Sequence, residues 1–122
     1  MEYLNVLFAG RLNRRTYLVG GFLIGIVYYV VLYIVGLLGH NALTSLLTLV
    51  IVLLVMVIGF SMSAKRWHDL GQSGWLSLLL LIPLINFFVW LYLVLAPGKS
   101  GSNAYGSQPA DAFEFQKVYQ YK

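Results

Sequence analysis

The chain has 122 residues, of which 60% are hydrophobic and only 10% are charged, a composition typical of a membrane protein and not of a soluble domain. Its formal net charge is +4, but the basic residues flank apolar runs, where they act as topology signals and lipid-phosphate contacts, so no nucleic-acid partner is expected. The absence of cysteine excludes disulfides, thiol chemistry and cysteine metal sites.

The first element expected is a short helix over about residues 1–10 that lies in the membrane interface. Its apolar residues recur at helical spacing, as in amphipathic interfacial helices. The basic residues come only afterwards, and the apolar run behind them is longer than the roughly 7–15 residues of a signal-peptide core. The run is therefore interpreted as a retained first membrane helix and not as a cleavable signal.

Long charge-free runs follow. Residues 16–64 and 70–98 contain no Lys, Arg, Asp or Glu, and a charge at the middle of a bilayer costs roughly 2.5–3.5 kcal/mol on insertion scales. The first run predicts spans over about residues 16–38 and 43–64, each long enough for the roughly 20 residues that cross the hydrocarbon. Because the loop between them is short, polar and uncharged, the two spans are predicted to form an antiparallel helical hairpin.

A third apolar segment covers about residues 75–96 and contains Pro83 and Asn86 near its middle. Its length favours a single span kinked at the proline; a re-entrant helix–turn–helix that enters and leaves on one side is the alternative. The whole is predicted to be an all-α integral membrane protein with three hydrophobic helical segments in a membrane domain over residues 1–96. Residues 97–122 are predicted to form a polar tail, whose first part folds against the membrane surface.

The basic residues predict the orientation. Five Lys and Arg residues close to span ends share one side of the membrane in this topology, and the loop over residues 39–42 has none. By the positive-inside rule the N-terminus is expected on the cytoplasmic side of the membrane, in a multi-pass protein. The five are Arg11, Arg14, Arg15, Lys65 and Arg66.

Two pairs of small residues lie within the predicted spans. Gly21 and Gly25 form one pair, and Gly59 and Ser63 form the other. Such spacing permits close helix packing, either inside one chain or in a homodimer. Packing inside the chain is favoured, because three short helices need close contacts to hold together.

The polar residues beside the spans suggest a binding site. Guanidinium groups bind phosphate or carboxylate through paired donors, and histidine donates or accepts near neutral pH. The carboxylate of Asp69 is expected within ion-pair reach of Arg11, Arg14 or Arg66, because its negative charge offsets the repulsion between the arginines. The plainer interpretation is that the basic residues are topology anchors, one of them paired with the aspartate. The candidate anion or lipid-headgroup site comprises Arg11, Arg14, Lys65, Arg66, His68 and Asp69.

No enzymatic activity, metal or cofactor is expected. A metal-dependent phosphohydrolase would need further His and Asp ligands around His68, but the other histidine, His40, is predicted on the opposite face. The favoured function is therefore a non-enzymatic membrane protein that binds lipid headgroups, a small anion or a partner protein. A broken helix at Pro83 and Asn86 is the feature most typical of transporters, so a subunit of a small oligomeric transporter or channel is the alternative.

Three polar motifs occur in order around the apolar spans: Phe8-x-Gly10-Arg11-x-x-Arg14-x-x-Tyr17, then Lys65-Arg66-Trp67-His68-Asp69-x-Gly71-x-Ser73-Gly74-Trp75, then Gly98-x-x-Gly101-x-Asn103-x-Tyr105-Gly106-x-x-Pro109. In this order the chain resembles the small bacterial inner-membrane proteins of domain-of-unknown-function family 805, the YhaH-like proteins. The departures are Lys65 for the usual Arg, Trp67 for a common Leu and Leu18 for a common Trp. The resemblance implies an integral membrane protein and supplies no activity.

Overall fold

A computed structural model of the chain describes residues 8–106. The helices in this range are α2 (Arg14–Leu37), α3 (Ala42–Asp69), the 3₁₀ helix η1 (Gly74–Leu81) and α4 (Ile85–Leu95). The predicted all-α class with three hydrophobic segments is confirmed. Most of the interfacial helix expected over residues 1–10 and Pro109 of the tail motif lie outside the described residues.

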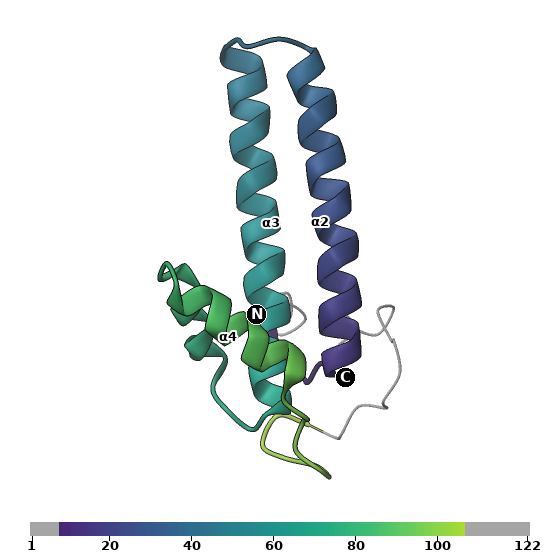
Figure 1. Cartoon of the computed structure of the whole chain (residues 1–122), viewed down its shortest axis with the longest axis vertical. Helices are drawn as coiled ribbons and strands as arrows, with labels where there is room; N and C mark the ends of the chain where they lie inside the picture. Colours follow the sequence, from purple (N-terminus) through teal and green to yellow (C-terminus); the bar gives the residue numbers. More distant parts are fainter. Residues whose placement is uncertain (1–7, 107–122) are drawn as a thin grey trace.

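Helices α2 and α3 stand side by side as a hairpin (Figure 1). Each begins at an asparagine whose side chain accepts a hydrogen bond from a backbone N–H, Asn13 from Thr16 and Asn41 from Thr44. Both helices are long and apolar enough to cross a membrane, with 24 and 28 residues. At 1.5 Å per residue they extend about 36 and 42 Å, whereas the hydrocarbon core is about 30 Å thick, so one end of α3 has room to project into the headgroup region.

Apolar side chains face outward on the hairpin, and polar side chains face inward at one end of it. Phe22 and Val27 on α2 are 61% and 62% exposed. In contrast, every residue from 61 to 70 on α3 and just after it is buried, including Arg66 and Asp69. This inverted distribution is the one expected of a protein whose surroundings are lipid.

The polar end of α3 is helical, although the predicted span ends at about residue 64. Helix α3 continues through Asp69. Nothing between Lys65 and Asp69 breaks a helix, and the first residue that does is Gly71, with a φ of 78°. The charged side chains therefore keep fixed helical spacing.

The third hydrophobic segment breaks at Pro83, as expected, but it does not continue in the same direction. Leu84, just after the proline, is the central residue of a γ-turn, with a φ of 69° and a ψ of −49°; the Ile85 N–H donates to the Pro83 carbonyl at 2.8 Å, and the chain reverses. The 8 residues of η1 and the 11 residues of α4 each extend about 16 Å, roughly half the thickness of the hydrocarbon.

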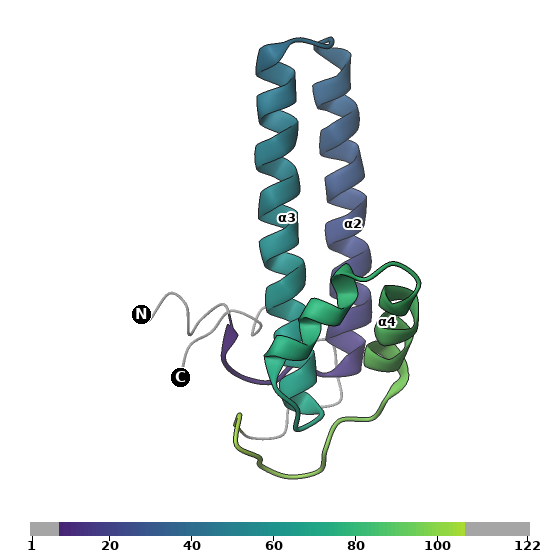
Figure 2. The same cartoon turned by 90° about the vertical axis from the view of Figure 1, so that its left-hand side faces the viewer.

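The prediction that residues 75–96 form a single span is therefore wrong. One helix over this range would separate its ends by about 30 Å at 1.5 Å per residue. Instead, both ends lie at the polar end of the hairpin: a Cβ placed on Gly74 would come within 2.8 Å of the Ala64 Cβ, and Arg66 donates a hydrogen bond to the Ala96 carbonyl. Figures 1 and 2 show α4 beside the same half of the hairpin, so the segment is a helix–turn–helix that returns to the end of the hairpin where it began; it is called the re-entrant segment below.

The prediction that small residues pack the helices closely within the chain is also wrong for the glycines. A Cβ added at Gly21, Gly25 or Gly59 would meet nothing within 4 Å. Ser63, the fourth small residue, makes a buried hydrogen bond of 3.0 Å with the hydroxyl of Tyr17. The two long helices are therefore joined at the polar end, and their glycine faces are open.

Candidate functional site

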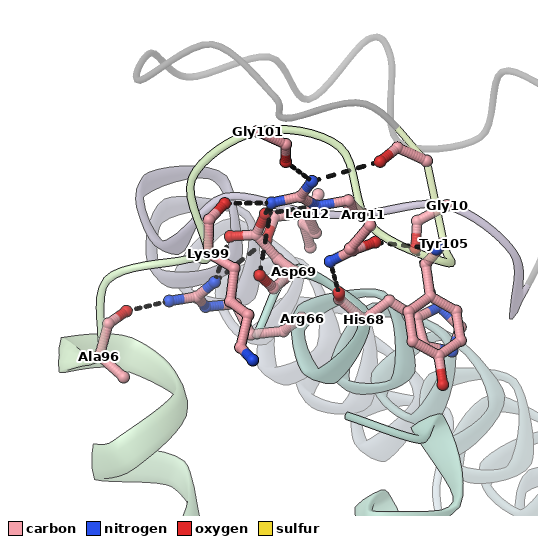
Figure 3. Close-up of polar contacts among 12 residues, drawn as sticks. Gly10, Arg11, Leu12, Arg66, His68, Asp69, Ala96, Lys99, Gly101 and Tyr105 are labelled. Atoms are coloured by element: carbon pink, nitrogen blue, oxygen red, sulfur yellow. Dashed lines mark hydrogen bonds and ion pairs between the residues drawn. The ribbon is translucent and has the colours of Figure 1, made fainter. Parts of the chain in front are cut away.

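The three polar motifs meet around Asp69 at the end of α3 (Figure 3). The Oδ1 of Asp69 lies 3.0 Å from the Arg11 Nη2, and its Oδ2 lies 2.7 Å from the Arg66 Nη1. The exposed fractions of the three side chains are 4%, 1% and 0%. The expected ion pair is confirmed, and Asp69 pairs with two arginines at once. Because buried charges are costly unless they are paired, this cluster holds together as a unit.

Arg66 attaches the re-entrant segment to α3. Its Nε donates to the Leu93 carbonyl at 2.6 Å, its Nη2 donates to the Ala96 carbonyl, and its Nη1 also donates to the Leu12 carbonyl at 3.3 Å. The last carbonyls of a helix have no partner within the helix, and a cation near them is favourable because of the helix dipole. Arg66 therefore caps the C-terminal end of α4.

Arg11 binds the tail. Its Nη1 donates to the carbonyls of Gly101 and Gly106 at 2.6 and 3.3 Å, and its Nη2 donates to the Lys99 carbonyl at 2.6 Å. The Lys99 N–H in turn donates to the Asp69 carbonyl at 2.8 Å. This guanidinium therefore fixes the backbone of the tail motif with nearly all of its donors.

His68 joins all three motifs. Its ring stacks on Tyr105 with centroids 4.0 Å apart and planes 4° apart. Its Nδ1 lies 2.9 Å from the Gly10 carbonyl, and its own carbonyl accepts from the Asn103 Nδ2 at 2.9 Å. A carbonyl can only accept, so Nδ1 carries the proton in the contact with Gly10. Under the favoured single-span topology the tail would lie on the other side of the membrane from His68, so these contacts contradict that placement.

Gly98 fits against the cluster because it has no side chain. A Cβ at this position would overlap the Asp69 carboxylate. The carboxylate is already fixed by two arginines, so it has little freedom to move away. The glycine of the tail motif is therefore required by the close approach of the tail to Asp69.

The outward-facing charge of the site comes from other residues. Asp69 is the one carboxylate among residues 8–106, which also contain six Lys and Arg residues. Lys65 is buried, whereas Arg14, Arg15 and Lys99 are exposed. The candidate site predicted from the sequence did not include Arg15 or Lys99, although both lie next to the polar motifs in the sequence.

Arg14 lies at the edge of the cluster. It was expected to join the other arginines around Asp69, and instead its Nη1 donates to the Leu95 carbonyl at 3.1 Å. It therefore supports the end of α4 beside Arg66, with its side chain at the surface.

Three polar residues of the apolar helices face outward. Asn86 is exposed on α4, and Tyr29 and Tyr33 on α2 are 71% and 70% exposed. Among the residues that the structure describes, no group of three or more His, Cys, Asp or Glu is placed to hold a metal ion.

Fold and site together define an all-helical membrane protein in which a polar cluster joins three motifs at one end of a helical hairpin. The chain belongs to the family of proteins of unknown function DUF805, whose model matches residues 5–107.

The relatives of the chain include two inner membrane proteins of Escherichia coli. The chain is 33% identical over 117 residues to the inner membrane protein YhaI of Escherichia coli strain K12. The alignment covers 88% of this chain and 93% of the relative. It is 30% identical over 115 residues to the inner membrane protein YhaH of the same strain, with 88% and 94% covered. No solved structure matches the chain. The resemblance to this family is confirmed, as is the membrane class; the relatives' names give no activity.

Proposed function

We propose that the protein is a non-enzymatic inner-membrane protein that crosses the membrane twice and binds the headgroups of anionic lipids at the cytoplasmic surface. The observation that carries this proposal is the distribution of charge at the polar end. Asp69 is enclosed by arginines, while Arg14, Arg15 and Lys99 are exposed. Each Lys or Arg near an anionic surface contributes about 1 kcal/mol of attraction.

The contacts of the buried arginines favour a binding role for the exposed cations in their place. The guanidinium nitrogens of Arg11 and Arg66 donate to carbonyls and to Asp69. A phosphate that entered there would have to displace these hydrogen bonds. The exposed side chains of Arg14, Arg15 and Lys99 offer positive charge at the surface, where a phosphate can approach them from outside the buried cluster.

Neutralising Arg15 and Lys99 together, as Arg15→Gln and Lys99→Gln, is expected to weaken the preference for anionic lipid. About 1 kcal/mol per charge corresponds to a roughly five-fold loss of relative affinity for each substitution. The measurement is the ratio of anionic to zwitterionic phospholipid that co-purifies with the protein from mixed membranes. The control is the pair Arg15→Lys and Lys99→Arg, which keeps both charges. Equal ratios in the neutral and charge-conserving pairs would reject the proposal.

The cytoplasmic orientation is tested with single cysteines, because the chain has none of its own. The exposed residues His40, Gln72 and Ser102 are each replaced by cysteine. In intact cells a membrane-impermeant thiol reagent should label the variant at 40 and leave those at 72 and 102 unlabelled until lysis. Labelling at 102 with protection at 72 would contradict the re-entrant segment, and labelling at both would invert the orientation.

A further inference from the structure

A groove of about 350 Å³ runs along the apolar part of the bundle between α2, α3 and the re-entrant segment. Backbone lines much of it, because Gly21, Gly25 and Gly59 lie along it and a Cβ on any of them would meet nothing within 4 Å. Leu80 of η1 and Trp90 of α4 also line the groove. Neither the hairpin nor the polar cluster uses this concavity.

We propose that the groove holds one acyl chain of an anionic phospholipid whose phosphate lies at Arg14. This inference rests on the proposed function and places the bound lipid on the protein. Arg14, Tyr17 and Gly21 are separated by three and four positions on α2, so they lie on one face of that helix. Arg14 also contacts the Leu95 carbonyl at the end of α4, the helix that contributes Trp90 to the groove. Two walls of the groove therefore lead to the same exposed guanidinium.

The lining of the groove is polar at one end and apolar along the rest of its length, as a phospholipid is. The hydroxyls of Tyr17 and Ser63 form a hydrogen bond of 3.0 Å and lie at the end of the groove nearer Arg14. Farther along α3, Val55 and Met56 make the lining apolar. The apolar length is complementary to an acyl chain, and the cation at one end is complementary to a phosphate.

A slender chain suits the groove better than a second copy of the protein. Helix pairs of the GxxxG type meet through open faces of small residues, and a helix with its side chains is about 10–12 Å wide. Here Gly21 and Gly59 line a concavity that residues of η1 and α4 also border. A volume of about 350 Å³ is instead within the range of small-molecule sites, about 300–1,000 Å³.

The test fills the groove without changing any charge. Gly21→Leu and Gly25→Leu place a large side chain in the groove, and leucine favours a helix more than glycine does. Gly36→Leu is the matched control, because Gly36 is exposed on the same helix, has nothing within 4 Å of its Cβ position and lies outside the groove lining. Each variant is reconstituted in nanodiscs of phosphatidylglycerol and phosphatidylcholine and transferred to mild detergent. Native mass spectrometry then counts the phospholipids and chains that stay together.

The parent chain and Gly36→Leu should retain a phosphatidylglycerol molecule that Gly21→Leu and Gly25→Leu lose. Equal retention in Gly21→Leu and Gly36→Leu would overturn the inference. A dimer lost in Gly21→Leu with lipid retention unchanged would also overturn it, because the groove would then hold a second copy.

The two proposals fail in different ways. If Arg15→Gln with Lys99→Gln leaves the preference for anionic lipid unchanged, the proposed function fails, while loss of lipid in Gly21→Leu still supports the groove. If the charge preference stands and the glycine variants retain lipid like the control, the groove proposal alone is overturned.

Discussion

Replacing Asp69 by asparagine is expected to destabilise the protein by about 3–5 kcal/mol, the usual cost of removing one partner from a buried ion pair. Asparagine keeps the shape of the side chain but removes the charge that Arg11 and Arg66 face at 3.0 and 2.7 Å. Two guanidinium groups with side chains only 1% and 0% exposed would then lack a compensating charge. Thermal unfolding in detergent micelles, followed by tryptophan fluorescence, to which the buried Trp67 contributes, measures the loss.

The control for this variant is Lys99→Gln, which removes an exposed charge next to the same cluster. A surface substitution of this kind usually changes stability by less than about 0.5 kcal/mol. Adding Arg11→Gln to Asp69→Asn should cost less than Arg11→Gln does alone, because the two side chains interact directly. If Asp69→Asn were no more destabilising than Lys99→Gln, the ion pairs would not stabilise the fold.

The hairpin could be predicted from the sequence because lipid imposes a simple rule on it. A charge inside the hydrocarbon is costly, so residues 16–64 contain none, and the helices observed there differ from the predicted spans by only a few residues at three of their four ends. The exception is the end of α3, where the sequence marks a change from apolar to polar residues but not the end of the helix. The change in polarity does not determine where the helix ends, and it is Gly71 that limits the length of α3.

The path of the third segment could not be decided in the same way. A run of apolar residues with a central proline fits both a kinked span and a re-entrant turn, because each satisfies the bilayer. The deciding feature is the γ-turn at Leu84, a conformation that an apolar pattern does not encode. Arg66 attaches the re-entrant segment to α3 through the carbonyls of Leu93 and Ala96.

The cluster around Asp69 was predicted in part, and the role of its arginines was not. The sequence placed Arg66 and Asp69 together through charge balance, and they do lie together. It assigned Arg66 to an external anion, whereas the guanidinium donates to the carbonyls of Leu93 and Ala96. The sequence does not mark which backbone carbonyls lack a partner, so the hydrogen-bond donors that they need can be identified only once the positions of the helix ends are known. Whether the exposed cations bind lipid stays a prediction.

Arg66→Lys is expected to release the re-entrant segment from the hairpin although it leaves the net charge unchanged. The guanidinium reaches Leu93, Ala96 and Asp69 with three different nitrogens. A lysine carries all of its donors on one atom and cannot reproduce that fork. Each buried carbonyl left without a partner costs about 1–3 kcal/mol, so most of the capping of α4 should be lost while the charge pair with Asp69 survives.

The release can be detected with a buried reporter on η1. Ser77 is 1% exposed, and its Oγ makes no hydrogen bond within the described residues, so Ser77→Cys should change the packing little. This cysteine should resist a thiol reagent in the parent chain and react in the Arg66→Lys background. Arg15→Lys makes the same chemical change at an exposed position and should leave the cysteine protected. Equal protection in both backgrounds would mean that the charge of Arg66, and not the geometry of its donors, holds the re-entrant segment against α3.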